Sequence, residues 1–299
     1  MRFSIYQESR LGRRKNNEDR IGYSYSRDAL LMVVADGMGG HLQGEVAAHI
    51  AVRFLIQAFR NEATPRLREP SRFLEDSILR AHHAILDYAQ ARRLPDTPRT
   101  TCVACLVQDA TAHWAHVGDS RLYHIREGTV RTRTRDHSRV QQLVDEGRIR
   151  EEAMHLHPER NRVWNCLGSL GDPAIEMAPP SILNAGDTVL LCSDGFWTPL
   201  SNSGIAGAFA SADVMTTVPK LMDMAESRAG RECDNVSVVA MTWDEDASTV
   251  PHHVSTRSLS GITTQAQDFG SGSASPDMTD EEIEHAIEEI RMAIRRNSA

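Results

Sequence analysis

Apolar residues fall in short runs along the chain, and the length of these runs predicts buried strands. The clearest run covers residues 29–35, which are all apolar. Such a run is too short to cross a membrane and suits one strand that is buried on both faces. Similar runs predict further strands at 3–7, 101–107, 112–117, 121–126, 129–133, 173–178, 187–192 and 236–243.

Helices are predicted where apolar residues recur at helical spacing. Residues 44–60 place Val46, Ile50 and Phe54 on one face, as an amphipathic helix does. A second helix is predicted over 71–93, with Pro70 at its start, where proline is well tolerated. Shorter helices are predicted at 138–147, 201–210 and 213–229.

The order of these elements predicts an α+β fold. Two strand-rich blocks are each accompanied by a pair of helices, which indicates two antiparallel sheets that face each other with the helices outside. Residues 136–172 interrupt the pattern with a helix and a long polar stretch. We interpret this segment as an excursion over one end of the sheets, where functional loops usually lie.

The composition changes after Asp244. Residues 245–277 are rich in Ser, Thr, Gly and Asp, so we expect a flexible linker between a domain at 1–244 and a short C-terminal amphipathic helix at 278–299. The sequence at 279–282 is a capping box. The helix places four isoleucines on one face, at positions 283, 287, 290 and 294. Three roles for this face remain open: docking on the protein's own core, pairing with a second copy of the chain, or binding a partner.

Composition and charge narrow the class of protein. The chain has 299 residues, of which 40% are hydrophobic and 25% charged, as in an ordinary globular protein. Its net charge of −8 argues against a nucleic-acid binder. We expect no membrane span, because no apolar stretch approaches the required length of about 20 residues, and no signal-peptide core at the start. These features favour a cytoplasmic protein.

The cysteines support the same compartment. There are five, an odd number, and most lie in apolar runs, which favours reduced and buried thiols. Cys102 and Cys105 form a C-x-x-C pair inside a predicted strand. Residues three apart in a strand face opposite ways, so we expect neither a zinc site nor a redox pair there.

Aspartates stand at the ends of four predicted strands. They are Asp36, Asp119, Asp194 and Asp234, and glycine accompanies three of them. A single Asp-Gly pair is more often only a turn, but the repetition favours a shared site. If these ends converge, the carboxylates repel one another, and bound cations are needed to stabilise them. A site with only oxygen ligands suits Mg²⁺ or Mn²⁺ better than zinc.

Taken together, the motifs at 3–243 resemble the PP2C-like, metal-dependent Ser/Thr protein phosphatases in their bacterial form. The resemblance depends on an ordered set of motifs. They are Arg14-x-x-Asn17-x-Asp19, Asp36-Gly37-Met38-Gly39-Gly40-His41-x-x-Gly44-Glu45, Thr100-Thr101, Gly118-Asp119-Ser120-Arg121, Asp136-His137-Ser138, Asn165-x-Leu167-Gly168, Ser193-Asp194-Gly195 and Asp234-Asn235.

The resemblance implies an αββα sandwich with the metals at one end of the sheets. It implies that Asp36, Asp194 and Asp234 hold one ion, and that Asp36 and the carbonyl of Gly37 hold a second. It also implies that Asp119, together with Asp194, serves a weaker third ion. In this interpretation residues 1–244 form the phosphatase domain.

The resemblance also assigns roles around these ions. Asp19 holds water in the outer shell, Glu18 assists there, and Arg14 binds the substrate phosphate. Arginine suits this role because its planar fork donates two parallel hydrogen bonds. The neighbouring Arg13 is the rival for it. The catalytic set expected on this basis is Arg14, Asp19 and Asp36.

The expected reaction is hydrolysis of phosphoserine and phosphothreonine on proteins, by water or hydroxide activated between two Mn²⁺ or Mg²⁺ ions. The expected partners are phosphoproteins made by a Ser/Thr kinase. Eukaryotic relatives carry a proposed histidine acid where this chain has Met38, which cannot donate a proton. His41 is interpreted as structural, and water on the metal is the preferred donor.

Two other functions remain open at this stage. A catalytically silent domain of this fold could bind phosphoproteins, although such a domain would be expected to lack some of the ligands. A phosphatase for a small phosphorylated metabolite would share the same metal chemistry.

Overall fold

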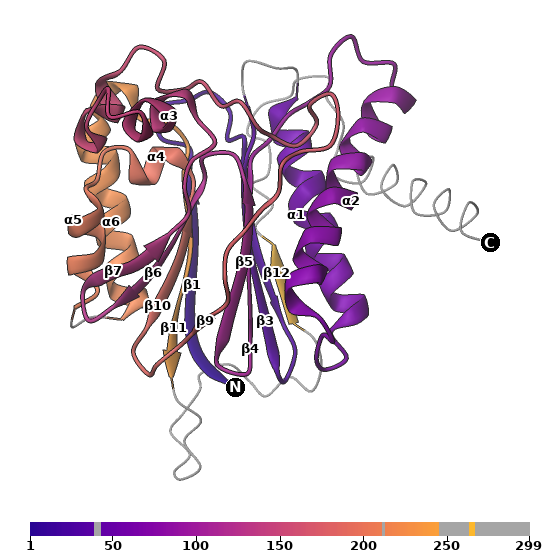
Figure 1. Cartoon of the computed structure of the whole chain (residues 1–299), viewed down its shortest axis with the longest axis vertical. Coiled ribbons are helices and arrows are strands. Elements are labelled where there is room, and N and C mark those ends of the chain that lie inside the picture. The colour runs from indigo at the N-terminus through magenta and orange to yellow at the C-terminus, as the bar shows by residue number, and fades with distance from the viewer. Residues whose placement is uncertain (39–42, 211–212, 245–262, 267–299) are drawn as a thin grey trace.

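The structure is a computed structural model of the chain, and it describes residues 1–38, 43–210, 213–244 and 263–266. Two antiparallel sheets lie face to face (Figure 1). Helices α1 (Gly44–Glu62) and α2 (Pro70–Ala91) cover the outer face of one sheet. Helices α5 (Asn202–Ala208) and α6 (Val214–Ala229) cover the outer face of the other. The predicted α+β class and its αββα arrangement are therefore confirmed.

The smaller sheet has five strands in the order β1-β11-β10-β6-β7. Their bounds are Arg2–Arg10 for β1, Val236–Asp244 for β11, Thr188–Cys192 for β10, Arg121–Arg126 for β6 and Thr129–Arg133 for β7. Strand β11 pairs with β1 on one side and with β10 on the other, both antiparallel.

The larger sheet has seven strands in the order β12-β2-β3-β4-β5-β8, and β9 also pairs with β5. Their bounds are Thr263–Ala266 for β12, Asp19–Tyr25 for β2, Ala29–Asp36 for β3, Cys102–Gln108 for β4, Thr111–Val117 for β5, Glu176–Met177 for β8 and Ser181–Ile182 for β9.

Short helices lie above the ends of the sheets (Figure 1). Helix α4 (Asp194–Trp197) directly follows β10, and α3 (Arg139–Asp145) lies in the excursion between the β7 and β8 strands. The excursion also contains the 3-10 helix η1 (Glu151–Leu156), and a second 3-10 helix, η2 (Gly230–Glu232), precedes β11. None of the helices in the described part of the chain is long and apolar enough to span a bilayer.

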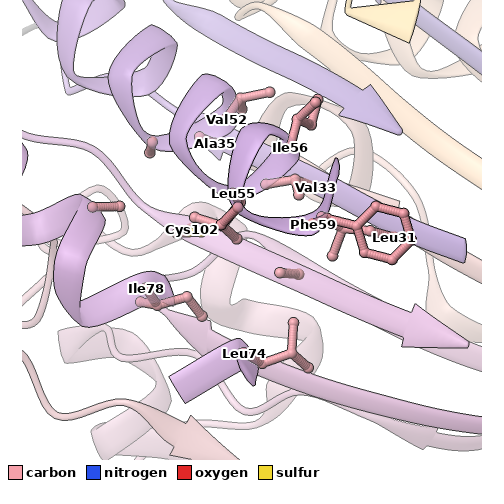
Figure 2. Close-up of a cluster of buried hydrophobic side chains, with 14 of the residues drawn as sticks. Leu31, Val33, Ala35, Val52, Leu55, Ile56, Phe59, Leu74, Ile78 and Cys102 are labelled. Carbon is pink, nitrogen blue, oxygen red and sulfur yellow. The ribbon is translucent and has the colours of Figure 1, made fainter. Parts of the chain in front are cut away.

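Strand alternation divides the interior into three buried layers. Leu31 and Val33 of β3 face helices α1 and α2, where they join a cluster with Leu55 and Phe59 (Figure 2). Their neighbours along the strand point the other way and join the cluster between the two sheets. A third cluster lies between the smaller sheet and α4, α5 and α6. The apolar run at 29–35 in β3 is therefore required, because both faces of the strand are covered there.

The two cysteines of the C-x-x-C pair lie on opposite faces, as predicted. Cys102 belongs to the cluster under α1 and α2, whereas Cys105 belongs to the cluster between the sheets. All five cysteines are buried free thiols. Burial raises the pKa of Cys102 to about 12, which keeps this thiol protonated and unreactive.

The structure differs from the sequence prediction in several places. Strand β2 lies where only the end of a polar loop was expected, and β1 is longer than the predicted 3–7. The strand predicted at 173–178 is reduced to Glu176–Met177. Strand β12 pairs with β2 and lies inside the stretch expected to be a linker. The rest of 245–277 and the helix predicted at 278–299 lie outside the described residues, so those expectations stay predictions.

Candidate active site

Strand β3 delivers Asp36 to one end of the larger sheet, and its last residue is fixed by two threonines. The Asp36 amide donates to Thr101 Oγ1 at 3.0 Å, and the Thr101 amide donates back to the Asp36 carbonyl at 2.9 Å. Thr100 Oγ1 also donates to that carbonyl, at 2.9 Å. The backbone that carries the carboxylate is therefore held before any ligand arrives.

Asp19 begins the neighbouring strand and lies directly opposite Asp36 in the register of β2 and β3. Its side chain is buried, and its Oδ2 accepts a hydrogen bond from Ser193 Oγ at 2.7 Å. Its Oδ1 is buried as well but has no hydrogen-bond partner among the described residues. A buried carboxylate oxygen without a donor is costly, which indicates that this oxygen faces a ligand or water.

Three further aspartates reach the same end of the sandwich from other strands. Asp119 lies in the turn between β5 and β6, and so between the larger sheet and the smaller one. Asp194 is the first residue of α4, immediately after β10. Asp234 lies in the turn before β11. Strands of both sheets therefore contribute to one site.

The pKa directions show that these carboxylates act on one another. Burial raises the pKa of Asp36, and the charges of Asp19, Asp194 and Asp119 raise it further. Burial also raises the pKa of Asp194 well above its usual value, with added repulsion from Asp119 and Asp234. The five aspartates therefore share one electrostatic site, in which adding negative charge is unfavourable.

The pKa values of two of these carboxylates lie close to neutral pH. The pKa of Asp119 is raised to about 7, chiefly by burial and then by the charge of Asp136. The pKa of Asp19 is raised to about 6, chiefly by burial, although the hydroxyls of Ser237 and Ser193 partly offset this effect. Bound cations would lower all of these pKa values, because they favour the charged carboxylates.

Gly37 is required by a close approach of two backbones. Its amide donates to the Glu18 carbonyl at 3.2 Å, and a Cβ atom at this position would lie only 2.4 Å from the carbonyl of Gly44. The pKa of Glu18 is raised to about 7 by burial and by the charge of Glu45. Glu18 is thus beside the aspartates, where an outer-shell role is sterically possible. The roles predicted for Glu18 and for the Gly37 carbonyl stay predictions.

The guanidinium of Arg14 lies beside the aspartate cluster. Its Nη2 lies 2.5 Å from Asp234 Oδ2, and this hydrogen bond raises its pKa. Its side chain is 54% exposed, so the guanidinium remains accessible to an incoming anion. The rival Arg13 is held by its backbone, whose amide donates to the Cys233 carbonyl at 2.9 Å. Of the two arginines, Arg14 is the one whose guanidinium bonds an aspartate of the cluster.

A groove of about 940 Å³ opens beside the cluster. Arg14, Asp194 and Asp234 lie on its wall. Much of the remaining wall comes from two stretches, residues 151–161 of the excursion and residues 197–203, which run from the end of α4 to the start of α5. The excursion predicted over one end of the sheets therefore borders the candidate site.

Sequence reasoning gave no role to several hydroxyl groups that support Asp19. Ser193 Oγ, which donates to Asp19, accepts from the Ser237 amide at 3.1 Å, and Ser237 Oγ bonds Ser9 Oγ at 2.7 Å. Ser193 is visible in the sequence only as the neighbour of Asp194. Its contact with Asp19 joins residues that are 174 positions apart, and no local pattern predicts such a contact.

The donor set fits a hard divalent cation. The converging side chains are carboxylates, which are the ligands that Mg²⁺ and Mn²⁺ prefer. The unpartnered Oδ1 of Asp19 and the raised pKa of Asp36 and Asp194 show that added positive charge would be favourable at this site.

A cluster of His116, His137 and Glu176 has metal-ligand spacing, but its hydrogen bonds argue against a metal. His137 Nδ1 accepts from the Gly118 amide at 3.2 Å, so its Nε2 carries the proton and faces Glu176 at 3.2 Å. His116 Nε2 lies 2.7 Å from the Arg135 carbonyl and must donate to it. Only one imidazole lone pair is left, so this cluster is better explained as support for the Gly118 turn.

A second such cluster contains His82, His83 and Asp172. His82 Nδ1 accepts from the Gly168 amide at 3.1 Å, so the neutral ring carries its proton on Nε2. His83 Nε2 already bonds Asp172 at 3.0 Å. The aspartate cluster is therefore the better candidate for metal binding.

Comparison with known proteins identifies the family that the chain resembles. The family model for protein phosphatase 2C matches residues 6–229. The chain is 36% identical over 229 residues to the serine/threonine protein phosphatase PstP of Mycobacterium tuberculosis, covering 76% of this chain and 42% of that protein. It is 32% identical over 231 residues to the serine/threonine phosphatase stp of Listeria innocua, covering 76% of this chain and 90% of that one.

A solved structure is similar as well. It is the catalytic domain of the serine/threonine protein phosphatase PstP in complex with two manganese ions, with a TM-score of 0.67 and 31% identity. The match covers 82% of this chain and 100% of that one. The chain thus spans less than half the length of the mycobacterial relative, whereas it covers the whole of the solved PstP catalytic domain.

Proposed function

The chain belongs to the protein phosphatase 2C family, and on that premise we propose that it is a metal-dependent protein-serine/threonine phosphatase. The reaction is hydrolysis of the phosphate ester on phosphoserine or phosphothreonine. The observation that carries the proposal is the convergence of Asp19, Asp36, Asp119, Asp194 and Asp234 from both sheets beside an accessible arginine.

The aspartates would hold the cations. Asp36, Asp194 and Asp234 are proposed to bind one Mn²⁺ or Mg²⁺ ion, and Asp36 with the Gly37 carbonyl a second. Asp119 and Asp194 are proposed to serve a weaker third ion. Bound there, such ions supply a water nucleophile of lowered pKa and neutralise charge on the phosphate.

Asp19 is proposed to orient the water that attacks phosphorus. Its Oδ2 is occupied by Ser193, whereas its buried Oδ1 has no partner among the described residues. That free oxygen can accept a hydrogen bond from a water molecule and hold it in line with the scissile bond. Ser193 keeps the carboxylate from rotating, so the acceptor is fixed before substrate arrives.

Arg14 is proposed to bind the phosphate. Its guanidinium now bonds Asp234 and stands on the wall of the groove. A phosphate that enters the site competes for the same N–H donors, and the planar fork can hold two phosphate oxygens at once. This contact orients the phosphorus toward the aspartate cluster.

The leaving oxygen also needs a proton. Met38 lies close to the cluster but has no proton to give, and His41 lies outside the described residues. We therefore propose that a water molecule of the site protonates the leaving group. We propose a protein as the substrate, because the groove is much larger than a phosphate group alone would fill.

The test is a turnover assay with p-nitrophenyl phosphate and a phosphothreonine peptide in the presence of Mn²⁺. Asp36→Asn or Asp194→Asn should lower turnover at least about 100-fold, the scale found when one electrostatic group is removed from an active site. Chelation by EDTA should silence the wild type. Asp223→Asn, at an aspartate whose side chain is 72% exposed, is the matched control and should retain full activity.

Undiminished turnover in either site variant would contradict the proposal. A wild type that binds Mn²⁺ and a phosphopeptide in calorimetry but turns over neither substrate would indicate a silent binding domain. Turnover of small phosphate esters but of no phosphopeptide would indicate a metabolite phosphatase.

A further inference from the structure

The wall of the groove includes a short segment that belongs to neither sheet. Helix η1 (Glu151–Leu156) has only 3-10 hydrogen bonding, and it lies in the excursion rather than in a sheet. Glu151, Met154 and Leu156 all line the groove. Met154 is buried, whereas Leu156 is 74% exposed, so apolar packing holds the middle of the segment and leaves its two ends to polar contacts.

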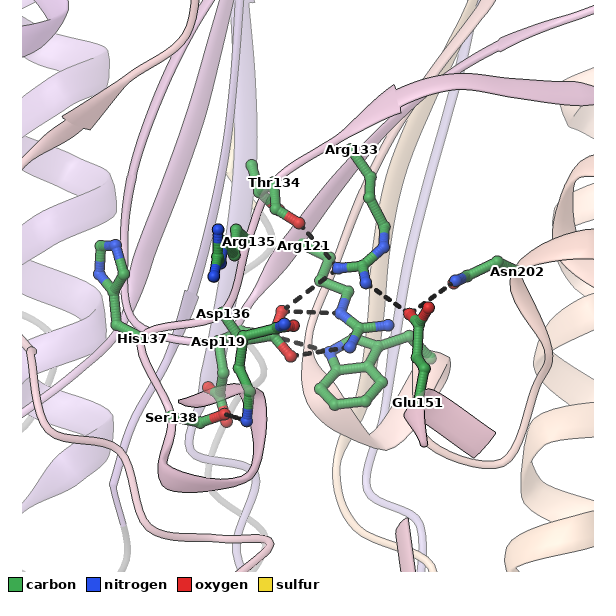
Figure 3. Close-up of polar contacts among 12 residues, drawn as sticks. Asp119, Arg121, Arg133, Thr134, Arg135, Asp136, His137, Ser138, Glu151 and Asn202 are labelled. Carbon is green, nitrogen blue, oxygen red and sulfur yellow. Dashed lines mark hydrogen bonds and ion pairs between the residues drawn. The ribbon is translucent and has the colours of Figure 1, made fainter. Parts of the chain in front are cut away.

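One carboxylate attaches the N-terminal end of this segment to the scaffold. Glu151 Oε1 accepts a hydrogen bond from Asn202 Nδ2 at 3.0 Å and a second, shorter one from Arg133 (Figure 3). Arg133 is the last residue of β7, and Asn202 is the first residue of α5. A single oxygen atom of the excursion is thus held between two elements of the scaffold, and the bond to Arg133 is charge-assisted.

The same contacts continue inward to the aspartate cluster. Asn202 Oδ1 accepts from the Tyr123 hydroxyl at 3.1 Å, and that hydroxyl accepts from Arg121 at 3.1 Å. The Arg121 guanidinium lies 3.4 Å from the ring centre of Trp197. The indole of Trp197 donates to the Asp119 carbonyl at 3.0 Å. The buried part of this network is rigid, because Arg121 is also bound by two parallel hydrogen bonds to Asp136, at 2.8 and 2.7 Å.

We propose that Glu151 is a positioning residue for the polypeptide part of the substrate. Its shared carboxylate, which we call the Glu151 latch, is defined by the bonds from Arg133 and Asn202. The latch holds η1 as a fixed wall of the groove beside Arg14 and Asp194. The inference rests on the proposed phosphatase function, and it adds the group that sets the shape of the peptide site.

The latch predicts a difference between substrates. The chain that flanks a phosphorylated residue extends into the groove and meets its wall, whereas p-nitrophenyl phosphate is small enough to stay at the aspartates. If η1 is released, it must become ordered again when the peptide binds, and this ordering costs binding free energy. The small ester requires no such ordering.

The experiment compares Glu151→Gln with the wild type on both substrates under saturating Mn²⁺. Glutamine keeps the size of the side chain and an acceptor for Asn202 but removes the charge that binds Arg133. We expect the KM for a phosphothreonine peptide to rise about tenfold, which corresponds to about 1.4 kcal/mol. The kcat for the peptide and the kcat/KM for p-nitrophenyl phosphate should stay within about twofold of the wild type.

The matched control is Glu159→Gln. Glu159 lies in the same excursion and its side chain is 39% exposed, against 41% for Glu151. It bonds Arg162 within the excursion and does not line the groove. This variant removes an equal charge without releasing η1, so its peptide KM should match the wild type.

A second variant and a second measurement make the test independent of charge. Asn202→Ala removes the other bond of the latch without changing the net charge and should also raise the peptide KM. Hydrogen exchange should become faster at the amides of Ala153 and His157, which donate within and just after η1 at 3.0 and 3.2 Å, in both latch variants but not in Glu159→Gln.

Several outcomes would overturn the inference. One is an unchanged peptide KM in both latch variants, and another is an equal rise in Glu159→Gln. A parallel fall in turnover of both substrates would assign Glu151 to the aspartate site instead. These results leave the proposed function standing, because p-nitrophenyl phosphate hydrolysis by the wild type tests that function separately.

Discussion

At the scale of single residues, the assignment of the phosphate-binding arginine is open to a sharp test. Arg14 and Arg13 are adjacent and equally charged, but only the Arg14 guanidinium is hydrogen-bonded to an aspartate of the cluster among the contacts described. Arg14→Lys should lower kcat/KM for p-nitrophenyl phosphate roughly tenfold to 100-fold, because lysine lacks the planar fork that binds two phosphate oxygens. The measurement is steady-state kinetics with saturating Mn²⁺.

The control for this prediction is Arg13→Lys, which preserves charge one residue away. It should change kcat/KM by less than about twofold, since the backbone contact of Arg13 with Cys233 does not depend on its side chain. If the two variants exchanged their effects, the phosphate contact would belong to Arg13.

The raised pKa values of the aspartates predict how the metal-free protein responds to pH. The pKa of Asp19 is about 6 and that of Asp119 about 7 in the folded protein, against 3.8 for an unperturbed aspartate. Between these limits the folded state binds more protons than the unfolded state. Stability from these groups is therefore full below about pH 4 and is lost as the pH rises through about 6 and 7.

The corresponding measurement is thermal unfolding in EDTA between pH 5 and pH 8. The melting temperature of the wild type should fall as the pH rises across this range, and it should fall less steeply in Asp194→Asn, which removes one of the repelling charges. Asp223→Asn should keep the slope of the wild type. Added Mn²⁺ should raise stability most at the alkaline end, because metal binding requires ionised carboxylates. A metal-free protein that gained stability with pH would contradict this account.

At the scale of elements, the contact between helix α4 and the start of β11 sets the distance between two of the aspartates. Gly195 follows Asp194 in α4, and a Cβ atom there would lie 2.2 Å from the Asn235 carbonyl. Gly195→Ala should therefore force α4 away from the turn that holds Asp234. We expect a loss of about 1–3 kcal/mol in unfolding free energy and weaker Mn²⁺ binding in calorimetry.

Another helical glycine supplies the comparison. Gly207 lies in α5, and a Cβ atom there would meet nothing within 4 Å. Gly207→Ala should be neutral or should stabilise the protein by up to about 1 kcal/mol, because alanine favours the helix. If the two substitutions changed the unfolding free energy equally, the close approach of Gly195 to Asn235 would not be what makes glycine necessary there.

The sequence predicts well those elements whose local pattern is also their structural cause. The strands at Cys102–Gln108, Thr111–Val117 and Arg121–Arg126 lie within one or two residues of the predicted ranges. Helices α1 and α2 also agree closely with their predicted ranges. In each case burial on one or both faces imposes the apolar pattern, so the pattern reports the element directly.

The elements that were missed depend on partners distant in the chain. In strand β2, Ile21 and Tyr23 alternate with polar residues and a glycine, so the strand has no continuous apolar run. It is held by pairing with β3 along its whole length. Strand β12 has only four residues and is formed by its pairing with β2. The local pattern is weak or short in both places, and pairing with a neighbouring strand supplies most of the support, so neither strand was predicted.

The candidate site divides in the same way. Asp36, Asp119, Asp194 and Asp234 were found because each stands at the end of a recognisable strand. Asp19 begins a strand that was not predicted, and only the family resemblance pointed to it. The Glu151 latch could not be found, because it brings together residues from the excursion, β7 and α5. Its residue types are ordinary surface residues, and only the folded chain gives them a common position.

At the scale of the whole molecule, the aspartate cluster lies at one end of the joint between the two sheets. Asp19 and Asp36 belong to strands of the larger sheet, whereas Asp194 and Asp234 flank strands of the smaller one. Apolar packing holds the sheets together along the rest of their length. In the absence of metal, like charges therefore oppose contact of the sheets at this end.

A cation that bridges these carboxylates should consequently stabilise the whole fold. With free Mn²⁺ at 100 times its dissociation constant, binding to the folded state alone adds about 2.7 kcal/mol. For a protein of this size that is a rise of roughly 5–10 °C in melting temperature. This rise in melting temperature with Mn²⁺ should disappear in Asp194→Asn and persist in Asp223→Asn.

Hydrogen exchange then locates the effect within the fold. Mn²⁺ should slow exchange at the ends of β3 and β10 together, because the ion bridges carboxylates attached to both sheets. Ser193 is informative, since its amide bonds the Ser237 carbonyl at 3.0 Å and its hydroxyl bonds Asp19 across the sheets. Protection confined to one sheet would mean that the ion is held by that sheet alone, and that the cluster does not join the two halves of the sandwich.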